Sequence, residues 1–124
     1  MTTWDKDILA KIRKTDDLHV APFRADGKTF GTLTWIWSVV VDEELFVRAY
    51  NGTNSRWYKA ALAQKSGRIT AAGMTLDVSF EQADAALNGK IDAAYRTKYS
   101  SSPYLNSMIS DRARSATIKI IPQN

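Results

Sequence analysis

The sequence predicts a single domain that is mainly β with α (α+β), built on six antiparallel strands in a barrel or sandwich with peripheral helices. Three observations indicate this class. Six segments are rich in β-branched and aromatic residues, and most are joined by short turns that suit hairpins. The regular strand–helix alternation of a parallel sheet is absent. The length of 124 residues suits one core and not two.

The first expected element is an amphipathic helix over about residues 5–14. Ile8, Leu9 and Ile12 fall on one face at helical spacing, and Trp4 extends that face. Acidic residues near its start and basic residues near its end suit the helix dipole. The single domain, 1–124, therefore divides into an N-terminal helix segment (1–16) and a barrel with helices (17–122).

Strands are expected over residues 18–24, 32–41, 45–50, 68–72, 74–80 and 117–121. The first contains Pro22, which places it at an edge or at a strand end. The second is the strongest, and both of its faces are apolar, so we expect it to be covered on both sides. Gly73 predicts a tight hairpin between the fourth and fifth strands.

Three further helical regions are expected, over residues 55–65, 84–99 and 104–109. The second of these is weakened at Asn88-Gly89, where two helices could meet. Lys65 sits in the last turn of helix 55–65, and Gly67 just beyond it predicts a left-handed cap.

Composition excludes several classes of function. There is no cysteine, which excludes disulfides, thiolate catalysis and cysteine-ligated metals. His19 is the single histidine and cannot anchor a typical zinc site alone, so we expect no metal; it is a proton donor or a barrel histidine with a hydrogen-bond partner. No apolar stretch reaches the roughly 20 residues of a membrane span, and no signal peptide is evident, so a cytoplasmic location is expected.

The net charge is 17 − 13 = +4, with a pI near 9.4. A basic balance favours anionic partners such as phosphates or nucleic acid. A solubilising surface explains the same charge.

The most informative segment runs from Arg48 to Trp57 as strand, polar loop and helix start. A helix start presents unpaired N–H groups that bind phosphate, and Gly52 allows close backbone approach. Arg48 and Arg56 could supply positive charge. The alternative is that Asn54 or Ser55 is only the helix N-cap and that Arg56 is solvated.

Other candidates are less specific. Trp35 and Trp37 could stack on a flavin ring or a base, or simply build the core. Arg24 and Lys28 flank the first turn and could reach a cofactor phosphate, or lie in solvent. Because no known catalytic motif occurs, an enzyme of this sequence would rely on a cofactor for its chemistry.

Several stretches resemble known families. Residues 45–74, with a Trp-Tyr pair at a helix start, and residues 104–122 resemble the deazaflavin-dependent nitroreductase family. The motifs are APFR (Ala21–Arg24), TWIWSVVVD (Thr34–Asp42), VRAYNG (Val47–Gly52) and SRWY (Ser55–Tyr58). They are similar to a small bacterial domain family of unknown function, grouped with split barrels of the nitroreductase and pyridoxamine-phosphate-oxidase-like kinds.

The resemblance implies a six-stranded antiparallel split β-barrel that forms a homodimer, with FMN or deazaflavin near the subunit interface. It implies a ring site along residues 32–35, including Thr34 and Trp35. It implies that the phosphate-bearing cofactor is held by Arg24, Lys28, Tyr50, Asn51, Asn54, Ser55 and Arg56. Haem or no cofactor would also fit such a barrel.

The leading functional hypothesis is a flavin- or deazaflavin-dependent oxidoreductase. The alternative is a non-enzymatic binding module that has lost its cofactor. A third is a single-stranded nucleic-acid binder with Tyr50, Trp57 and Tyr58 as stacking platforms, for which no RNA-binding signature is present.

Overall fold

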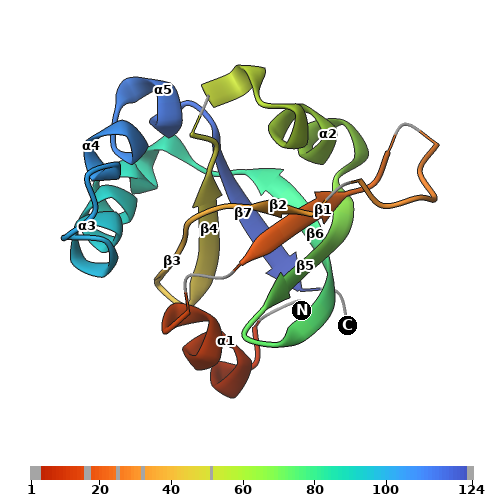
Figure 1. Ribbon diagram of the computed structural model, residues 1–124, viewed down its shortest axis with the longest axis horizontal. Helices are drawn as coiled ribbons and strands as arrows, with labels where there is room; N and C mark the ends of the chain where they lie inside the picture. The colour runs from red at the N-terminus through yellow and green to blue at the C-terminus, as the bar shows by residue number, and fades with distance from the viewer. Residues whose placement is uncertain (1–3, 16–17, 25, 32, 51, 123–124) are drawn as a thin grey trace.

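The computed structural model describes residues 4–15, 18–24, 26–31, 33–50 and 52–122 (Figure 1). Its strands are β1 (His19–Pro22), β2 (Thr34–Trp35), β3 (Ser38–Val41), β4 (Glu44–Arg48), β5 (Ser66–Ala71), β6 (Met74–Gln82) and β7 (Thr117–Pro122). Its helices are α1 (Lys6–Arg13), α2 (Arg56–Gln64), α3 (Asn88–Lys98), α4 (Leu105–Met108) and α5 (Asp111–Arg114), with short 3-10 turns η1 (Gly52–Asn54) and η2 (Ala85–Leu87). The fold is mixed α+β, which confirms the predicted class.

The strands form one curled antiparallel sheet in the order β2-β1-β5-β6-β7-β4-β3. Its two edge strands, β2 and β3, are consecutive in the sequence and are separated only by Ile36 and Trp37. A sheet whose opposite edges are joined so closely has to curl, and Figure 1 shows β1 and β2 crossing in front of β4 and β7. The result is a half-barrel, which confirms the barrel-like part of the prediction.

The sheet has seven strands in the described part of the chain, where the sequence pattern predicts six. The difference comes from the segment 32–41, which bends and divides instead of forming one strand. Its first half pairs with β1, with Thr34 opposite Val20, and its second half pairs with β4. At the bend, the Ile36 N–H donates to the Leu18 carbonyl (3.0 Å). One segment thus serves both edges of the sheet.

The expected helices are present: α1, α2 and α4 begin and end one residue inside the predicted bounds, and η2 together with α3 covers residues 85–98 of the predicted 84–99. The weak point predicted at Asn88-Gly89 is where η2 passes into α3. Helix α5 was not expected from the sequence. The prediction of a left-handed Gly67 is wrong: Lys65 adopts that conformation (φ 61°), and Gly67 lies within β5.

Two apolar clusters hold these elements together. The first fills the inside of the half-barrel under α1 and α2, and its fully buried members include Ile12, Val47 and Ile118. The second lies between the outer face of β3 and β4 and the helices α3 and α4, and it contains Phe46, Tyr95 and Met108. Alternate residues of β4 therefore enter different clusters, as a strand covered on both faces requires.

Candidate functional site

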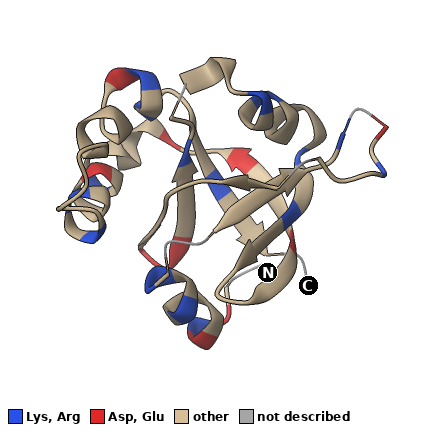
Figure 2. Cartoon of the chain, in the orientation of Figure 1, with Lys and Arg blue, Asp and Glu red and all other residues tan. Residues whose placement is uncertain are grey.

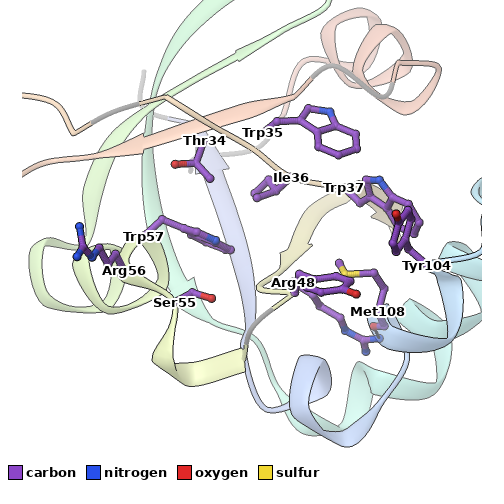
Figure 3. A pocket seen from close by; sticks show the side chains of 11 residues that line it. Thr34, Trp35, Ile36, Trp37, Arg48, Ser55, Arg56, Trp57, Tyr104 and Met108 are labelled. Carbon is purple, nitrogen blue, oxygen red and sulfur yellow. Dashed lines mark hydrogen bonds between the residues drawn. The ribbon is translucent and has the colours of Figure 1, made fainter.

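A cavity of about 650 Å³ opens between α2 and the α3–α5 helices (Figure 3). Its lining residues come from the bent segment of the edge strands, the end of β4, the start of α2 and the region of α4. They are Thr34, Trp35, Ile36, Trp37, Arg48, Tyr50, Ser55, Arg56, Trp57, Tyr104 and Met108. The volume falls within the range of roughly 300–1,000 Å³ that is common for small-molecule sites.

Aromatic side chains dominate the cavity walls. Trp35, Tyr50 and Tyr104 are 52%, 42% and 58% exposed, so their rings are accessible to a ligand. The rings of Tyr50 and Tyr104 meet edge to face, with centroids 6.2 Å apart. Trp37 is held rigidly, because it stacks on Tyr99 with the centroids 4.1 Å apart and the planes 3° from parallel. Such walls suit a flat aromatic ligand.

The start of α2 forms the polar end of the cavity. Ser55 is the N-cap residue, but its side chain makes no capping hydrogen bond. The first N–H groups of a helix have no acceptor within the helix and carry its positive dipole end. Ser55 and Trp57 face inward in Figure 3, whereas the guanidinium of Arg56 lies at the rim and is directed away from the aromatic walls. No carboxylate lines the cavity among the described residues, so this end favours an anion.

Arg48 forms part of the cavity floor, but its guanidinium is not available to a ligand. The side chain is 0% exposed. Its Nε donates to Thr117 Oγ1 (3.0 Å) and its Nη1 to Asp92 and the Met108 carbonyl. Its Nη2 donates to the side-chain and main-chain oxygens of Asn88. Because these contacts occupy the guanidinium's donors, the interpretation of Arg48 as a phosphate ligand is wrong.

The carboxylate of Asp92 balances the charge of Arg48 and also binds Arg114. Burial alone would raise the pKa of Asp92, but hydrogen bonds from Arg114 and Arg48 outweigh burial and lower that pKa below its ordinary value of 3.8. The three side chains form an ionic cluster beside the cavity, in which Arg48 and Asp92 are buried and Arg114 is partly exposed; we call it the Asp92 cluster.

The pH dependence of stability is expected to reflect Asp92. Since its pKa is lower in the folded state, its contribution to stability is present above the unfolded pKa of about 3.8 and is lost as the pH falls through the folded pKa. Urea denaturation of the unchanged chain and of Asp92→Asn, measured from pH 7 to pH 2.5, should therefore show a stability difference that shrinks toward acid. A difference that is constant with pH would contradict this assignment.

The structure brings some of the predicted site residues together. The cavity collects Thr34, Trp35, Tyr50, Ser55 and Arg56. Asn51 lies outside the described residues.

Other predicted residues lie elsewhere. Asn54 ends η1 and does not line the cavity. Arg24 and Lys28 belong to the β1–β2 loop, which reaches the far end of α2: a Cβ on Gly27 would lie 3.7 Å from Gln64, the last residue of that helix. The Nε of Arg24 donates to the Phe30 carbonyl (3.1 Å). These two basic residues are therefore separated from the start of α2, which forms the polar end of the cavity.

Sequence reasoning missed the contribution of the C-terminal helices. Tyr104 and Met108 are four residues apart, a spacing that predicts a shared helix face but not what that face covers. Arg112 also supports the cavity, since its Nε donates to the Tyr50 carbonyl (3.0 Å) and its guanidinium lies 5.5 Å from the Tyr50 ring centre. Gly52 leaves room for the Arg112 side chain, because a Cβ at position 52 would lie only 2.6 Å from Arg112 Cγ. The φ of Gly52, 74°, also favours glycine.

Comparison with known proteins identifies a family but no activity. Residues 8–120 match a family described as uncharacterised proteins conserved in bacteria (DUF2255). No curated protein matches the chain. Among solved structures, the chain is similar to the conserved hypothetical protein Rv2991 from Mycobacterium tuberculosis, with 10% identity and a TM-score of 0.67, covering 98% of this chain and 81% of that one. At this identity the likeness concerns the fold alone.

The described residues also contain neither a membrane-spanning helix nor a cluster of metal-ligating side chains. No helix there has the length and apolar character needed to span a membrane. No group of three or more potential metal-ligating side chains occurs in the same residues.

Proposed function

This chain belongs to the DUF2255 family of bacterial proteins, and we propose that its cavity binds FMN or a related flavin or deazaflavin. One observation carries the proposal: the start of α2, with no side-chain cap from Ser55, opens into a cavity with aromatic walls. A flavin mononucleotide combines the two groups that such a site selects, a flat ring system and a phosphate.

The aromatic walls support binding of the ring. Trp35 and Trp57 approach the cavity from different elements, and Tyr104 closes its other side (Figure 3). Offset or edge-to-face contact with such rings adds about 0.5–1.5 kcal/mol per pair beyond the burial of area. A planar heterocycle therefore gains more here than an aliphatic ligand of equal size.

The helix start supports binding of the phosphate. Its N–H groups supply oriented donors, the Ser55 hydroxyl adds one more, and the rim guanidinium of Arg56 supplies charge. The guanidinium would have to turn toward the ligand, which a long exposed side chain can do. Arg56 has no ion pair among the described residues to hold it away.

As an oxidoreductase, the protein would take a hydride from a reduced donor onto the flavin and pass it from the reduced flavin to a small electrophile. The chain's own residues would bind and orient the ring and exclude water from one of its faces. The same cavity without a cofactor is the binding-module alternative, and the outward direction of Arg56 is the feature that favours it.

A nucleic-acid interface receives less support from the charges. In Figure 2, Lys and Arg are spread over many elements and alternate with Asp and Glu. Single-strand binders instead concentrate positive charge along one groove. This distribution suits a solubilising surface.

The homodimer implied by the resemblance is part of the proposal. Leu33 and Trp35 are 48% and 52% exposed on the bent edge segment, and a second subunit would cover such apolar surface. Sedimentation equilibrium with and without FMN measures this directly, and a monomer under both conditions would contradict it.

Titration of the purified chain with FMN tests the cofactor proposal. Binding should quench tryptophan fluorescence and shift the flavin spectrum. Arg56→Ala should weaken binding by about tenfold, because one charge-assisted hydrogen bond contributes roughly 1.5 kcal/mol or more.

Arg24→Ala is the matched control, since it removes the same charge from the distant β1–β2 loop and should leave the dissociation constant unchanged. The cofactor proposal fails if, with the unchanged chain, neither FMN nor deazaflavin quenches the tryptophan fluorescence and neither cofactor's own spectrum shifts.

A further inference from the structure

One buried carboxylate joins three elements beside the cavity. Asp92, on α3, is only 3% exposed. Its Oδ1 accepts a hydrogen bond from Arg48 at the end of β4, and its Oδ2 accepts from Arg114 Nε on α5 (2.9 Å). This one side chain therefore joins α3 to the sheet and to α5.

Each of the two arginines leads to a residue that lines the cavity. Arg48 Nη1 donates to the Met108 carbonyl (3.1 Å), which ties the end of α4 to β4. Arg114 fixes α5, the same four-residue helix that carries Arg112. Arg112 in turn donates to the Tyr50 carbonyl, and its side chain packs against Gly52 before α2.

We propose that Asp92 and Arg114 are positioning residues for the cavity. They touch no ligand, but they hold Tyr50, Met108 and the helices behind them at the spacing that a planar ligand requires. This inference rests on the proposed function, because it assigns the Asp92 cluster a role in ligand binding. It also gives a reason for burying the charges of Arg48 and Asp92, since buried ion pairs are weak sources of net stability compared with apolar packing.

Arg114 is the best residue for the test. Its side chain is 38% exposed, so removing it should leave the chain folded, whereas changes at Arg48 or Asp92 strand a buried charge. Arg114→Ala frees one oxygen of Asp92. Arg114→Lys keeps the charge but not the double contact made by Nε and Nη2.

The control must lower stability without touching the cavity. Leu9 on α1 is 5% exposed and packs in the first apolar cluster, inside the half-barrel. Figure 1 shows α1 at the end of the molecule opposite α2. Leu9→Ala should therefore destabilise the fold and leave the cavity walls in place.

The first measurement is FMN affinity, at a temperature well below the melting point of every variant. We expect Arg114→Ala to weaken binding by about fivefold, a typical effect for a residue that acts on a site indirectly. Arg114→Lys should recover part of that loss, and Leu9→Ala should bind as the unchanged chain does. Equal affinities for Arg114→Ala and Leu9→Ala would overturn the positioning role.

The second measurement needs no ligand. Hydrogen exchange should show lost amide protection in residues 104–114 of Arg114→Ala, with the β5–β6 hairpin unchanged. Absence of FMN binding by the unchanged chain would overturn the proposed function alone, and this exchange pattern would still decide whether Arg114 holds the wall. Unchanged protection over 104–114 would overturn the positioning role by itself.

Discussion

Replacing Arg48 with methionine is expected to lower the free energy of unfolding by roughly 3–5 kcal/mol, the usual effect of breaking a buried ion pair from one side. Methionine can fill part of the space, but it satisfies neither Asp92 nor the oxygen atoms of Asn88 and Met108 that Arg48 now binds. Asp92 would keep only Arg114. Urea denaturation at neutral pH, with a two-state fit, measures the loss.

Arg96→Met is the matched control for this change. Arg96 is an exposed residue in the last turn of α3, and surface substitutions usually stay within about 0.5 kcal/mol. Arg48→Lys should fall between the two, because an ammonium keeps the charge but has fewer donors and no planar fork. If Arg48→Met is as stable as Arg96→Met, the Asp92 cluster contributes nothing to stability.

Arg48 also shows what the sequence could not predict. An arginine at the end of a strand, before a polar loop and a helix start, has the pattern of a phosphate ligand. Its actual partner, Asp92, is 44 residues away in the sequence and sits within a helix of unremarkable composition. Only the packing of α3 against the sheet brings them together, and no local pattern reports that packing. The prediction therefore failed at a contact of long sequence separation.

The residues at the start of α2 illustrate the opposite case. A strand, a polar loop and a helix start follow each other within ten residues, so local geometry alone determines that Ser55 occupies the N-cap position and that Arg56 begins the helix. What remained open was the other side of the cavity. Tyr104 and Met108 reach it from a helical region about fifty residues later, and their order in the sequence does not indicate which wall they form.

The divided strand 32–41 also combines a feature that the local sequence predicts with one that depends on distant contacts. Its composition predicts an extended chain, and it is extended on both sides of the bend. The bend itself depends on the β1–β2 and β3–β4 pairings, which place the two halves at opposite edges of the sheet. Strand content was therefore predictable from the residues, while strand number required the topology of the whole sheet.

Gly67 lies at a point where two strands of the curled sheet approach too closely for an added side chain. It lies in β5 opposite Pro22 of β1, and it is buried. A Cβ at this position would lie 2.5 Å from the Ala21 carbonyl oxygen and 2.6 Å from Pro22 Cα. Both neighbours are backbone atoms, so they cannot move aside as a flexible side chain would. The glycine is thus required by close strand approach and not by its backbone angles.

Gly67→Ala is accordingly expected to destabilise the fold by roughly 3 kcal/mol, the upper part of the usual range for overpacking a core. The melting temperature should fall by about 10 °C for a chain of this length.

Gly89→Ala is the control, because it makes the same glycine-to-alanine change without a steric clash. A Cβ at Gly89 meets nothing within 4 Å, and the residue lies in α3. Alanine favours helices over glycine by roughly 0.5–1 kcal/mol, so this second variant should be at least as stable as the unchanged chain. Thermal denaturation should therefore show a clear fall in melting temperature for Gly67→Ala and no fall for Gly89→Ala. A Gly67→Ala variant that melts with the unchanged chain would mean that β1 and β5 are farther apart than the structure places them, and the curl that encloses the first apolar cluster would have to be wider.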